Sequence, residues 1–181
     1  MSAVREAYLQ AAASATALLG DPAVEAAWAK PSALEAFTVA GLAGHLAAQV
    51  VNLPRVLGAP APDGPPVALA DHYSRVTWIG ADIDAETNVR VRQGGEALAA
   101  AGPRELVEQT GRAVSELRTL LAEEHVDRLV SPPAGPWAMR LDDFLVTRLM
   151  EITVHSDDLA YSVGVPTPTS HVTCSTRCSR C

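Results

Sequence analysis

The sequence predicts an all-α fold, an antiparallel bundle of four principal helices with a small hairpin or extended loop before the last of them. Composition is the first observation behind this prediction. Of the 181 residues, 48% are hydrophobic but only 4% are aromatic. Alanine is the most frequent of the hydrophobic residues, and it is the best helix former because its side chain loses no rotamer entropy. The second observation is periodicity, since apolar residues recur at steps of three and four along the long segments, as one buried helix face requires.

The first principal helix is expected over residues 2–19, followed by a short helical turn over 25–28. The apolar run 11–20 is about as long as the core of a signal peptide. However, Arg5 is accompanied by Glu6, so the segment before this run is not basic. A folded amphipathic helix is therefore the better interpretation. Its apolar face consists of Val4, Tyr8, Ala11, Ala15 and Leu18.

The second principal helix is expected over residues 38–53. Thr38 is its predicted N-cap, because a hydroxyl oxygen can accept a hydrogen bond from a free backbone N–H. Residues 58–66 are rich in proline and glycine and predict a surface connection. Residues 68–101 then predict two helical pieces joined near 80–84. The apolar stripe of the second principal helix consists of Val39, Leu42, Leu46, Val50 and Leu53.

The third principal helix is expected over residues 104–124, and a hairpin or extended loop separates it from the fourth. Segments 128–131 and 137–141 flank a proline-rich stretch, which favours a hairpin or extended loop. Asp142 or Asp143 is then the predicted N-cap of the last helix.

The last helix is expected to end near residue 163, because Gly164 follows and glycine favours the left-handed conformation that ends helices. Beyond residue 168 the composition changes abruptly to Ser, Thr, Cys and Arg. We therefore expect one helical domain over 1–166 and a disordered, cysteine-containing tail over 167–181.

The charge and the cysteines exclude several classes of protein. The 14 Lys and Arg against 21 Asp and Glu give a net charge of −7, the opposite of what a nucleic-acid-binding protein needs. No apolar run approaches the roughly 20 residues of a membrane helix. The three cysteines all lie in the last eight residues, whereas a secreted disulfide framework would distribute them through the fold. These features predict a cytoplasmic protein without nucleic-acid or membrane partners. A homodimer remains open.

The last helix carries one polar stripe on a mostly apolar circumference. Arg148, Glu151, His155, Asp158 and Ser162 follow at steps of 3, 4, 3 and 4, which places all five on one face. A helix that is apolar around most of its surface is usually central. Buried polar groups of this kind must then find partners, because an unpaired buried charge is costly.

Glu151 and His155 have the spacing of two ligands of one metal ion, a carboxylate oxygen and an imidazole nitrogen. Asp158 is then suited to orient a histidine ring. Arg148 is suited to neutralise an acid or to hold an anionic ligand. The alternative is an ordinary network of hydrogen bonds on a partly exposed face, since such pairs also occur by chance.

His45 favours the metal hypothesis. It lies in the middle of the second principal helix, on a stripe with Gly41, Ala48 and Asn52. Gly41 and Gly44 each cost about 1 kcal/mol in a helix interior, which a cavity or a close approach of another helix would offset. The alternative is a core histidine bonded to Asn52 or to a backbone carbonyl.

These residues carry a resemblance to a known family. Three segments resemble the N-terminal metal-binding domain of the mycothiol-dependent maleylpyruvate isomerases. They are Trp28 with PSAL at 31–34, FTV at 37–39 with LAGHL at 42–46, and RLMEITVHSDDLA at 148–160. That family belongs to the DinB-like bundles, and the resemblance covers residues 1–166. Its most specific element is E-x-x-x-H-x-x-D together with the upstream histidine.

The resemblance implies a divalent metal, commonly zinc, held by His45, Glu151 and His155. Three protein ligands leave a coordination position open, as in catalytic zinc sites. The resemblance further implies that the thiol of mycothiol binds there as a thiolate and reacts with an electrophilic substrate. In the isomerase, addition to an activated cis double bond, rotation and elimination give the trans isomer. Other members transfer a thiol or are uncharacterised.

The family also implies a cation for an anionic substrate. Arg92 matches a family arginine on the third helix, although Arg90 lies close, and Arg148 is the other candidate. The full isomerase carries a C-terminal domain that contributes to the active site, for which 181 residues leave no room. We therefore expect the metal-binding bundle and leave maleylpyruvate isomerisation itself open.

Two further hypotheses come from other classes of protein. One is a bundle that binds metal or ligand without turnover, and the other is a structural helical protein whose polar stripe is a network of ion pairs. In the tail, His171 with three thiols is a possible small zinc site, against the plainer interpretation of a disordered tail with exposed thiols. The thiols are those of Cys174, Cys178 and Cys181.

Overall fold

The computed structural model describes residues 1–168, and almost all of its regular structure is helical. The helices are α1 (Ala3–Leu19), α2 (Pro22–Ala27), α3 (Val39–Val51), α4 (Leu53–Gly58), α5 (Leu69–Arg75), α6 (Glu86–Ala99), α7 (Pro103–Glu123) and α8 (Leu141–Val163). The strands are β1 (Leu129–Val130) and β2 (Met139–Arg140). The all-α prediction is confirmed.

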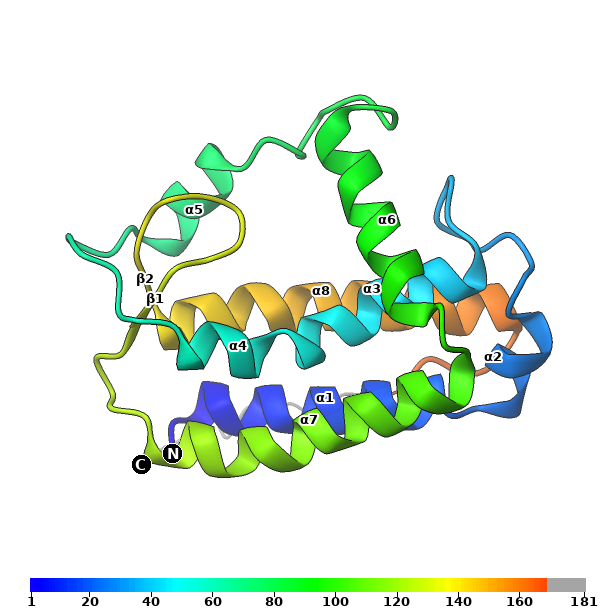
Figure 1. Cartoon of the computed structure of the whole chain (residues 1–181), viewed down its shortest axis with the longest axis horizontal. Helices are drawn as coiled ribbons and strands as arrows, with labels where there is room; N and C mark the ends of the chain where they lie inside the picture. The colour runs from blue at the N-terminus through cyan, green and yellow to red at the C-terminus, as the bar shows by residue number, and fades with distance from the viewer. Residues whose placement is uncertain (169–181) are drawn as a thin grey trace, which may run out of the picture.

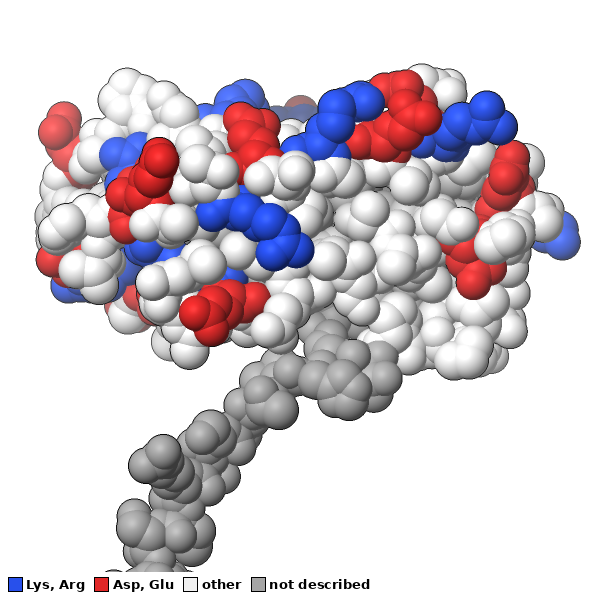
Figure 2. Space-filling model, turned by 90° about the horizontal axis from the view of Figure 1, so that it is seen from below, with Lys and Arg blue, Asp and Glu red and all other residues white. Residues whose placement is uncertain are grey.

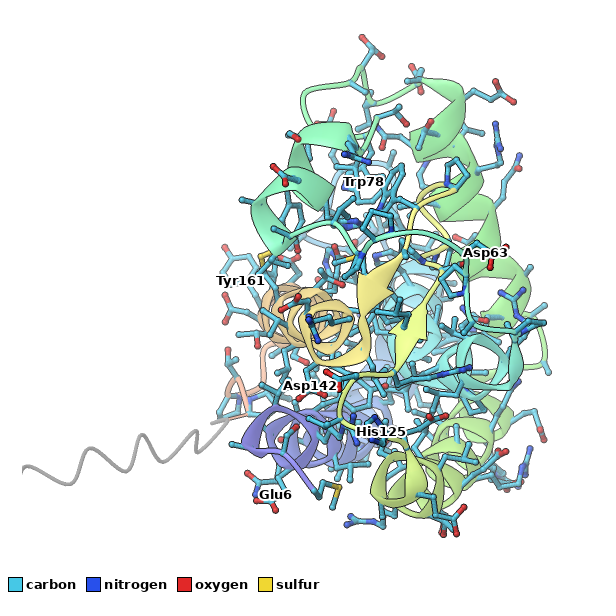
Figure 3. All side chains as sticks on the ribbon, turned by 90° about the vertical axis from the view of Figure 1, so that its left-hand side faces the viewer. Glu6, Asp63, Trp78, His125, Asp142 and Tyr161 are labelled. Carbon is cyan, nitrogen blue, oxygen red and sulfur yellow. The ribbon has the colours of Figure 1, made fainter. Side chains whose placement is uncertain are left out.

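Helices α1, α3, α7 and α8 pack against one another around the main apolar core. They are the four principal helices expected from the apolar periodicity. Figures 1 and 3 show α1 and α7 as one layer, α3 and α8 as the next, and α5 and α6 beyond them. The core includes the fully buried Tyr8, Leu42, Leu46, Leu117 and Leu145.

The directions of these helices depart from a simple antiparallel bundle. Arg5 in the first turn of α1 lies 2.9 Å from Asp142 in the first turn of α8, so these two helices run in the same direction. Arg5 also donates to the carbonyl oxygens of Leu121 and Glu124 at the C-terminal end of α7. The prediction of antiparallel neighbours is therefore confirmed for α1 and α7 but wrong for α1 and α8.

The reason is a long crossover. The chain leaves α4 at one end of the molecule, returns through α5 and α6, and enters α7 at the other end (Figure 1). Helices α3 and α7 consequently run in the same direction. Arg128, which follows α7, donates to the carbonyl oxygens of Leu57 and Ala59 at 2.8 Å. These bonds join the segment after α7 to the C-terminal end of α4.

The smaller elements also agree with the sequence. Strands β1 and β2 pair antiparallel, with Leu129 opposite Arg140, and confirm the hairpin before the last helix. Helices α5 and α6 are the two helical pieces expected between residues 68 and 101. Gly164 ends α8 in the left-handed conformation at φ 73°, as its position predicts.

One predicted helix cap is confirmed and one is wrong. Thr38 Oγ1 accepts a hydrogen bond from the backbone N–H of Gly41 at 3.0 Å. In contrast, α8 begins at Leu141 with Arg140 at the N-cap position and no side-chain cap. Strand β2 runs directly into this helix, which places Asp142 inside the first turn, where its carboxylate binds Arg5 instead.

Helices α3 and α6 approach each other closely through glycines. A Cβ atom on Gly44 would overlap the backbone carbonyl of Gly95, and one on Gly95 would overlap the carbonyl oxygen of Gly41. The close approach of another helix therefore explains why α3 tolerates glycines in its interior. The same close approach reaches the backbone of His45, because a Cβ on Gly95 would lie 3.1 Å from the backbone nitrogen of His45.

Basic and acidic side chains are interspersed on the face drawn in Figure 2 rather than gathered by sign. Within residues 1–168, no helix combines the length and the apolar character needed to cross a membrane. The cytoplasmic location stays a prediction. The proposed site of His171 and the three cysteines lies outside the described residues.

Candidate metal centre

Three possible metal ligands converge where α3 packs against α8. His45 comes from α3, and Glu151 and His155 come from successive turns of α8. Nε2 of His155 lies 3.2 Å and Nε2 of His45 lies 3.5 Å from the same oxygen, Oε2 of Glu151. All three potential ligand atoms lie within 4.8 Å of one another. The structure thus brings together the three residues that the sequence singles out as ligands, here called the triad.

Local helix geometry explains half of this arrangement. Residues four apart on a helix face the same side, so Glu151 and His155 meet without tertiary help. His45 reaches them because α3 packs against α8, and its ring lies edge-on to that of His155 with centroids 4.7 Å apart. The three side chains are 14–18% exposed, so they are held by the packing but remain accessible to a small ligand.

Asp158 orients His155. Its Oδ2 lies 3.0 Å from Nδ1 of His155, so an Nδ1–H can donate to the carboxylate. Burial lowers the pKa of His155, but the hydrogen bond and charge of Glu151 and those of Asp158 raise it more, and the pKa lies above its ordinary value. A carboxylate in this position fixes the ring and leaves Nε2 facing Glu151, as in many metal-binding histidines.

Glu151 is held as a carboxylate. Burial raises its pKa, but hydrogen bonds from His155 and His45 and the positive charge of Arg148 outweigh that effect. The pKa of Glu151 is therefore far below its ordinary value. A carboxylate that stays ionised over the working pH range is ready to bind a cation.

Arg148 is a partly buried cation one turn before Glu151. Its Nη1 donates to Oε1 of Gln49 at 2.6 Å and its Nε donates to Oγ1 of Thr147 at 3.0 Å. The guanidinium carbon also lies 5.1 Å from the centre of the Phe144 ring. Burial lowers the pKa of Arg148, and the negative charge of Glu151 opposes that shift.

Gln49 is a residue of this site that the sequence analysis missed. Its Nε2 donates to the backbone carbonyl of His45 at 2.9 Å, while its Oε1 accepts from Arg148. The buried hydroxyl of Tyr8 donates to the backbone oxygen of Gln49 at 2.9 Å. Its spacing of four residues from His45 is the signal that could have identified it, because that spacing puts Gln49 on the His45 side of α3.

The remaining predicted residues bond to partners outside the triad. Nη1 of Arg92 donates to the carbonyl of Ile83 at 2.6 Å and Nη2 lies 3.4 Å from Asp84, so this arginine holds the loop before α6. Ser162 accepts from the backbone N–H of Ala33 at 2.8 Å. Arg90, the alternative to Arg92, pairs with Glu86 at 2.7 Å on the surface.

Comparison with known proteins identifies a family. A family model described as the mycothiol maleylpyruvate isomerase N-terminal domain matches residues 9–160, a span that contains the whole triad. Comparison with curated proteins and with solved structures gave no match.

Proposed function

From the match over residues 9–160, the chain belongs to the mycothiol maleylpyruvate isomerase N-terminal domain family. We propose that this chain is a metal-dependent enzyme that uses a thiol, either an isomerase or a thiol transferase. The observation that carries the proposal is the convergence of His45, Glu151 and His155 within 4.8 Å. The scaffold in this proposal is a DinB-like bundle of α1, α3, α7 and α8.

The triad fits a divalent metal ion in both ligand type and protonation. When the Nδ1–H of His155 donates a hydrogen bond to Asp158, a neutral ring presents a lone pair at Nε2 toward the carboxylate of Glu151. Two electron-rich atoms 3.2 Å apart repel unless the ring is protonated or a cation satisfies both. Two imidazoles and one carboxylate are typical ligands of catalytic zinc, which keeps a fourth position open.

The chemistry supplied by a bound metal is the lowering of a coordinated thiol's pKa, which gives a thiolate near neutral pH. The cosubstrate that we propose is mycothiol, and the ion that we propose is zinc. The partly exposed triad side chains leave room for such a thiol to approach from solvent.

The other residues have separate roles in this proposal. Asp158 keeps the proton at Nδ1 of His155 and fixes the ring. Arg148 supplies the positive charge for an anionic group of the electrophilic substrate. We assign this role to Arg148, which lies one turn before Glu151, rather than to Arg92, which bonds the loop before α6 through Ile83 and Asp84.

Metal analysis of purified protein tests the ligand assignment. We expect about one divalent ion per wild-type chain and only a trace in the His45→Ala/His155→Ala double variant. His125→Ala is the matched control, because the side chain of His125 is 79% exposed and lies outside the triad. Equal trace metal in wild type and double variant would refute the assignment.

A panel of electrophiles tests turnover. The metal-loaded protein with mycothiol should convert at least one electrophile, either to its geometric isomer or to a thiol adduct. The double variant should do neither. Thiol binding without any product would instead favour a metal- and thiol-binding domain without turnover.

A further inference from the structure

His45 is the member of the triad whose ring lacks the kind of support that Asp158 gives to His155. Among the described residues, the only polar side chain paired with the ring of His45 is that of Glu151, whose Oε2 lies 3.5 Å from Nε2. Gln49 donates to the backbone carbonyl of His45 and not to its ring. Since a metal-binding imidazole must be held in one orientation, the support for His45 has to come from packing.

Two aromatic rings of the described residues pack against the ring of His45. The ring of His155 is edge-on to it, and the ring of Phe37 is tilted by 59° with its centroid 6.0 Å away. Rings with centroids 4.5–7 Å apart favour tilted and edge-on arrangements, which contribute more than their buried area alone. Because His155 is itself a ligand of the triad, Phe37 is the ring that can hold His45 from outside the triad.

Phe37 has a fixed place of its own in the segment between α2 and α3. Its backbone N–H donates to the carbonyl of Leu34 at 3.1 Å, and its carbonyl accepts from the N–H of Ser32 at 2.9 Å. Its side chain is partly buried and packs against the apolar core. The backbone of Phe37 is thus closed into a tight turn, and its ring is held between the core and His45.

The same turn contains one residue in an unfavourable backbone conformation. Ala36 has a φ of 63°, in the left-handed region where a Cβ atom comes too close to the following carbonyl oxygen. Such strain persists only where the surrounding structure imposes it, and it is found preferentially near functional sites. The position of Phe37 is therefore imposed by the hydrogen bonds of the turn and not by the local preference of the chain.

The turn is also tied to α8, the helix that supplies the other two ligands. The backbone N–H of Ala33 donates to Oγ of Ser162 at 2.8 Å, and this hydroxyl donates to the backbone carbonyl of Asp158 at 2.6 Å. Figure 1 shows the segment between α2 and α3 beside the C-terminal end of α8. Phe37 is therefore fixed relative to α8, whereas His45 belongs to α3.

We propose that Phe37 is a positioning residue that holds the ring of His45 with its Nε2 directed at Glu151. The consequence for metal affinity rests on the proposed function. In this arrangement each histidine of the triad has its own support, the carboxylate of Asp158 for His155 and the ring of Phe37 for His45. A ligand that is already oriented binds a metal more tightly, because its side chain does not have to be ordered on binding.

The zinc affinity of the full chain, measured by competition with a chromophoric chelator, tests this role. Phe37→Leu keeps an apolar side chain but removes the ring. We expect zinc binding about fivefold weaker, the equivalent of about 1 kcal/mol for an aromatic pair. Phe37→Tyr keeps the ring and should stay within about twofold of wild type.

Leu34→Ala is the matched control, because Leu34 lies in the same turn, is partly buried and packs against the same core. It should lower stability in urea and leave zinc affinity unchanged. An equal loss of zinc affinity in Leu34→Ala and Phe37→Leu would show that the turn acts only through general stability, which would overturn the role of Phe37.

NMR of the metal-free full chain gives a second measurement that does not depend on zinc. Wild type should show nuclear Overhauser contacts between the ring protons of Phe37 and His45, and the ring signals of His45 should move in Phe37→Leu. His72 is the internal reference. It is buried in α5, and its Nδ1 accepts a hydrogen bond from the indole N–H of Trp137 at 3.1 Å, so its ring signals should stay in place.

Equal zinc affinity of wild type and Phe37→Leu would overturn the proposal. Absence of the contact between Phe37 and His45 in wild type would overturn it as well, even if both variants failed to fold. Failure of the metal centre is a different result. Wild type would then bind zinc no better than the His45→Ala/His155→Ala double variant, while the contact between the two rings and the shift in Phe37→Leu would still support the role of Phe37.

Discussion

Asp158 lies 3.0 Å from Nδ1 of His155, while Nε2 of the same ring lies 3.2 Å from Glu151. One imidazole is thus held between two carboxylates, and each meets a different ring nitrogen. An Nδ1–H of this ring can donate to Asp158, and its Nε2 faces the same oxygen of Glu151 that Nε2 of His45 approaches.

Asp158→Asn should weaken zinc affinity about 10- to 100-fold, the usual cost of losing the partner that orients a metal-binding histidine. An asparagine keeps the size of the side chain but removes its charge, and its amide no longer requires Nδ1 to be the donor. Competition with a chromophoric chelator measures the affinity.

Asp157→Asn is the matched control for this substitution. Asp157 is the adjacent residue on α8, is exposed, and bonds the hydroxyl of Thr167 rather than the triad. It should leave zinc affinity unchanged. Equal effects of the two substitutions would show that only the net charge of α8 matters and not the orientation of His155.

Helix periodicity explains how much of this site could be predicted. The steps of 3 and 4 along α8 are a local property, and they placed Glu151, His155 and Asp158 on one face without knowledge of the fold. His45 needed tertiary packing, yet Gly41 and Gly44 beside it indicated the close helix approach that the structure contains.

The features that the sequence did not reveal depend on long-range topology. Parallel α1 and α8 follow from the crossover through α5 and α6, which no local pattern encodes. The cap expected at Asp142 failed because Arg5, 137 residues earlier in the chain, binds that carboxylate. His72 gave no signal because its partner Trp137 comes from a loop 65 residues away.

Gly44→Ala should destabilise the protein by about 2 kcal/mol or more, because the added methyl group would overlap the backbone of Gly95 and force α6 away from α3. Gly94, which is next to Gly95 in α6, provides the control. A Cβ there meets nothing within 4 Å, so Gly94→Ala should raise stability by up to about 1 kcal/mol through helix propensity. Urea unfolding measures both changes, and a neutral Gly44→Ala would contradict the close approach of the two helices.

Arg5→Gln should cost about 3 kcal/mol or more of unfolding free energy. Arg5 is 4% exposed, binds Asp142, and donates to three carbonyl oxygens at the end of α7. These groups would lose their partner in a place where water cannot fully replace it. Asp142 and His125, whose carbonyl is one of the three, are both bonded to Arg5 and lie near each other in Figure 3.

Arg112→Gln is the comparison for Arg5→Gln. Arg112 pairs with Glu105 and Glu108 on the surface of α7, with its side chain 63% exposed. Such exposed ion pairs contribute less than about 1 kcal/mol. A loss for Arg5→Gln no larger than that for Arg112→Gln would show that the junction of α1, α7 and α8 does not depend on this arginine.

Zinc should raise the melting temperature of chelator-treated protein, since a ligand specific to the folded state adds to the unfolding free energy. At a free zinc concentration of 100 times the dissociation constant, the gain is about 2.7 kcal/mol. The His45→Ala/His155→Ala double variant should not respond. An unchanged melting temperature in wild type would favour a structural network of ion pairs in place of a metal centre.

The stability of the protein should depend on pH through His72. Burial, together with the charge of Arg148, holds the pKa of this histidine below its ordinary value of 6.5. The unfolded chain therefore binds a proton that the folded chain does not, and this contribution to stability is present above pH 6.5 and is lost as the pH falls below it. His72→Gln should reduce the loss of stability between about pH 7.5 and pH 5.5 by up to about 1 kcal/mol.

The raised pKa of His155 acts in the opposite direction, but it is common to both proteins and cancels in the comparison. Urea unfolding at the two pH values measures the difference, and parallel pH profiles would mean that His72 is protonated as readily in the folded chain as in the unfolded one.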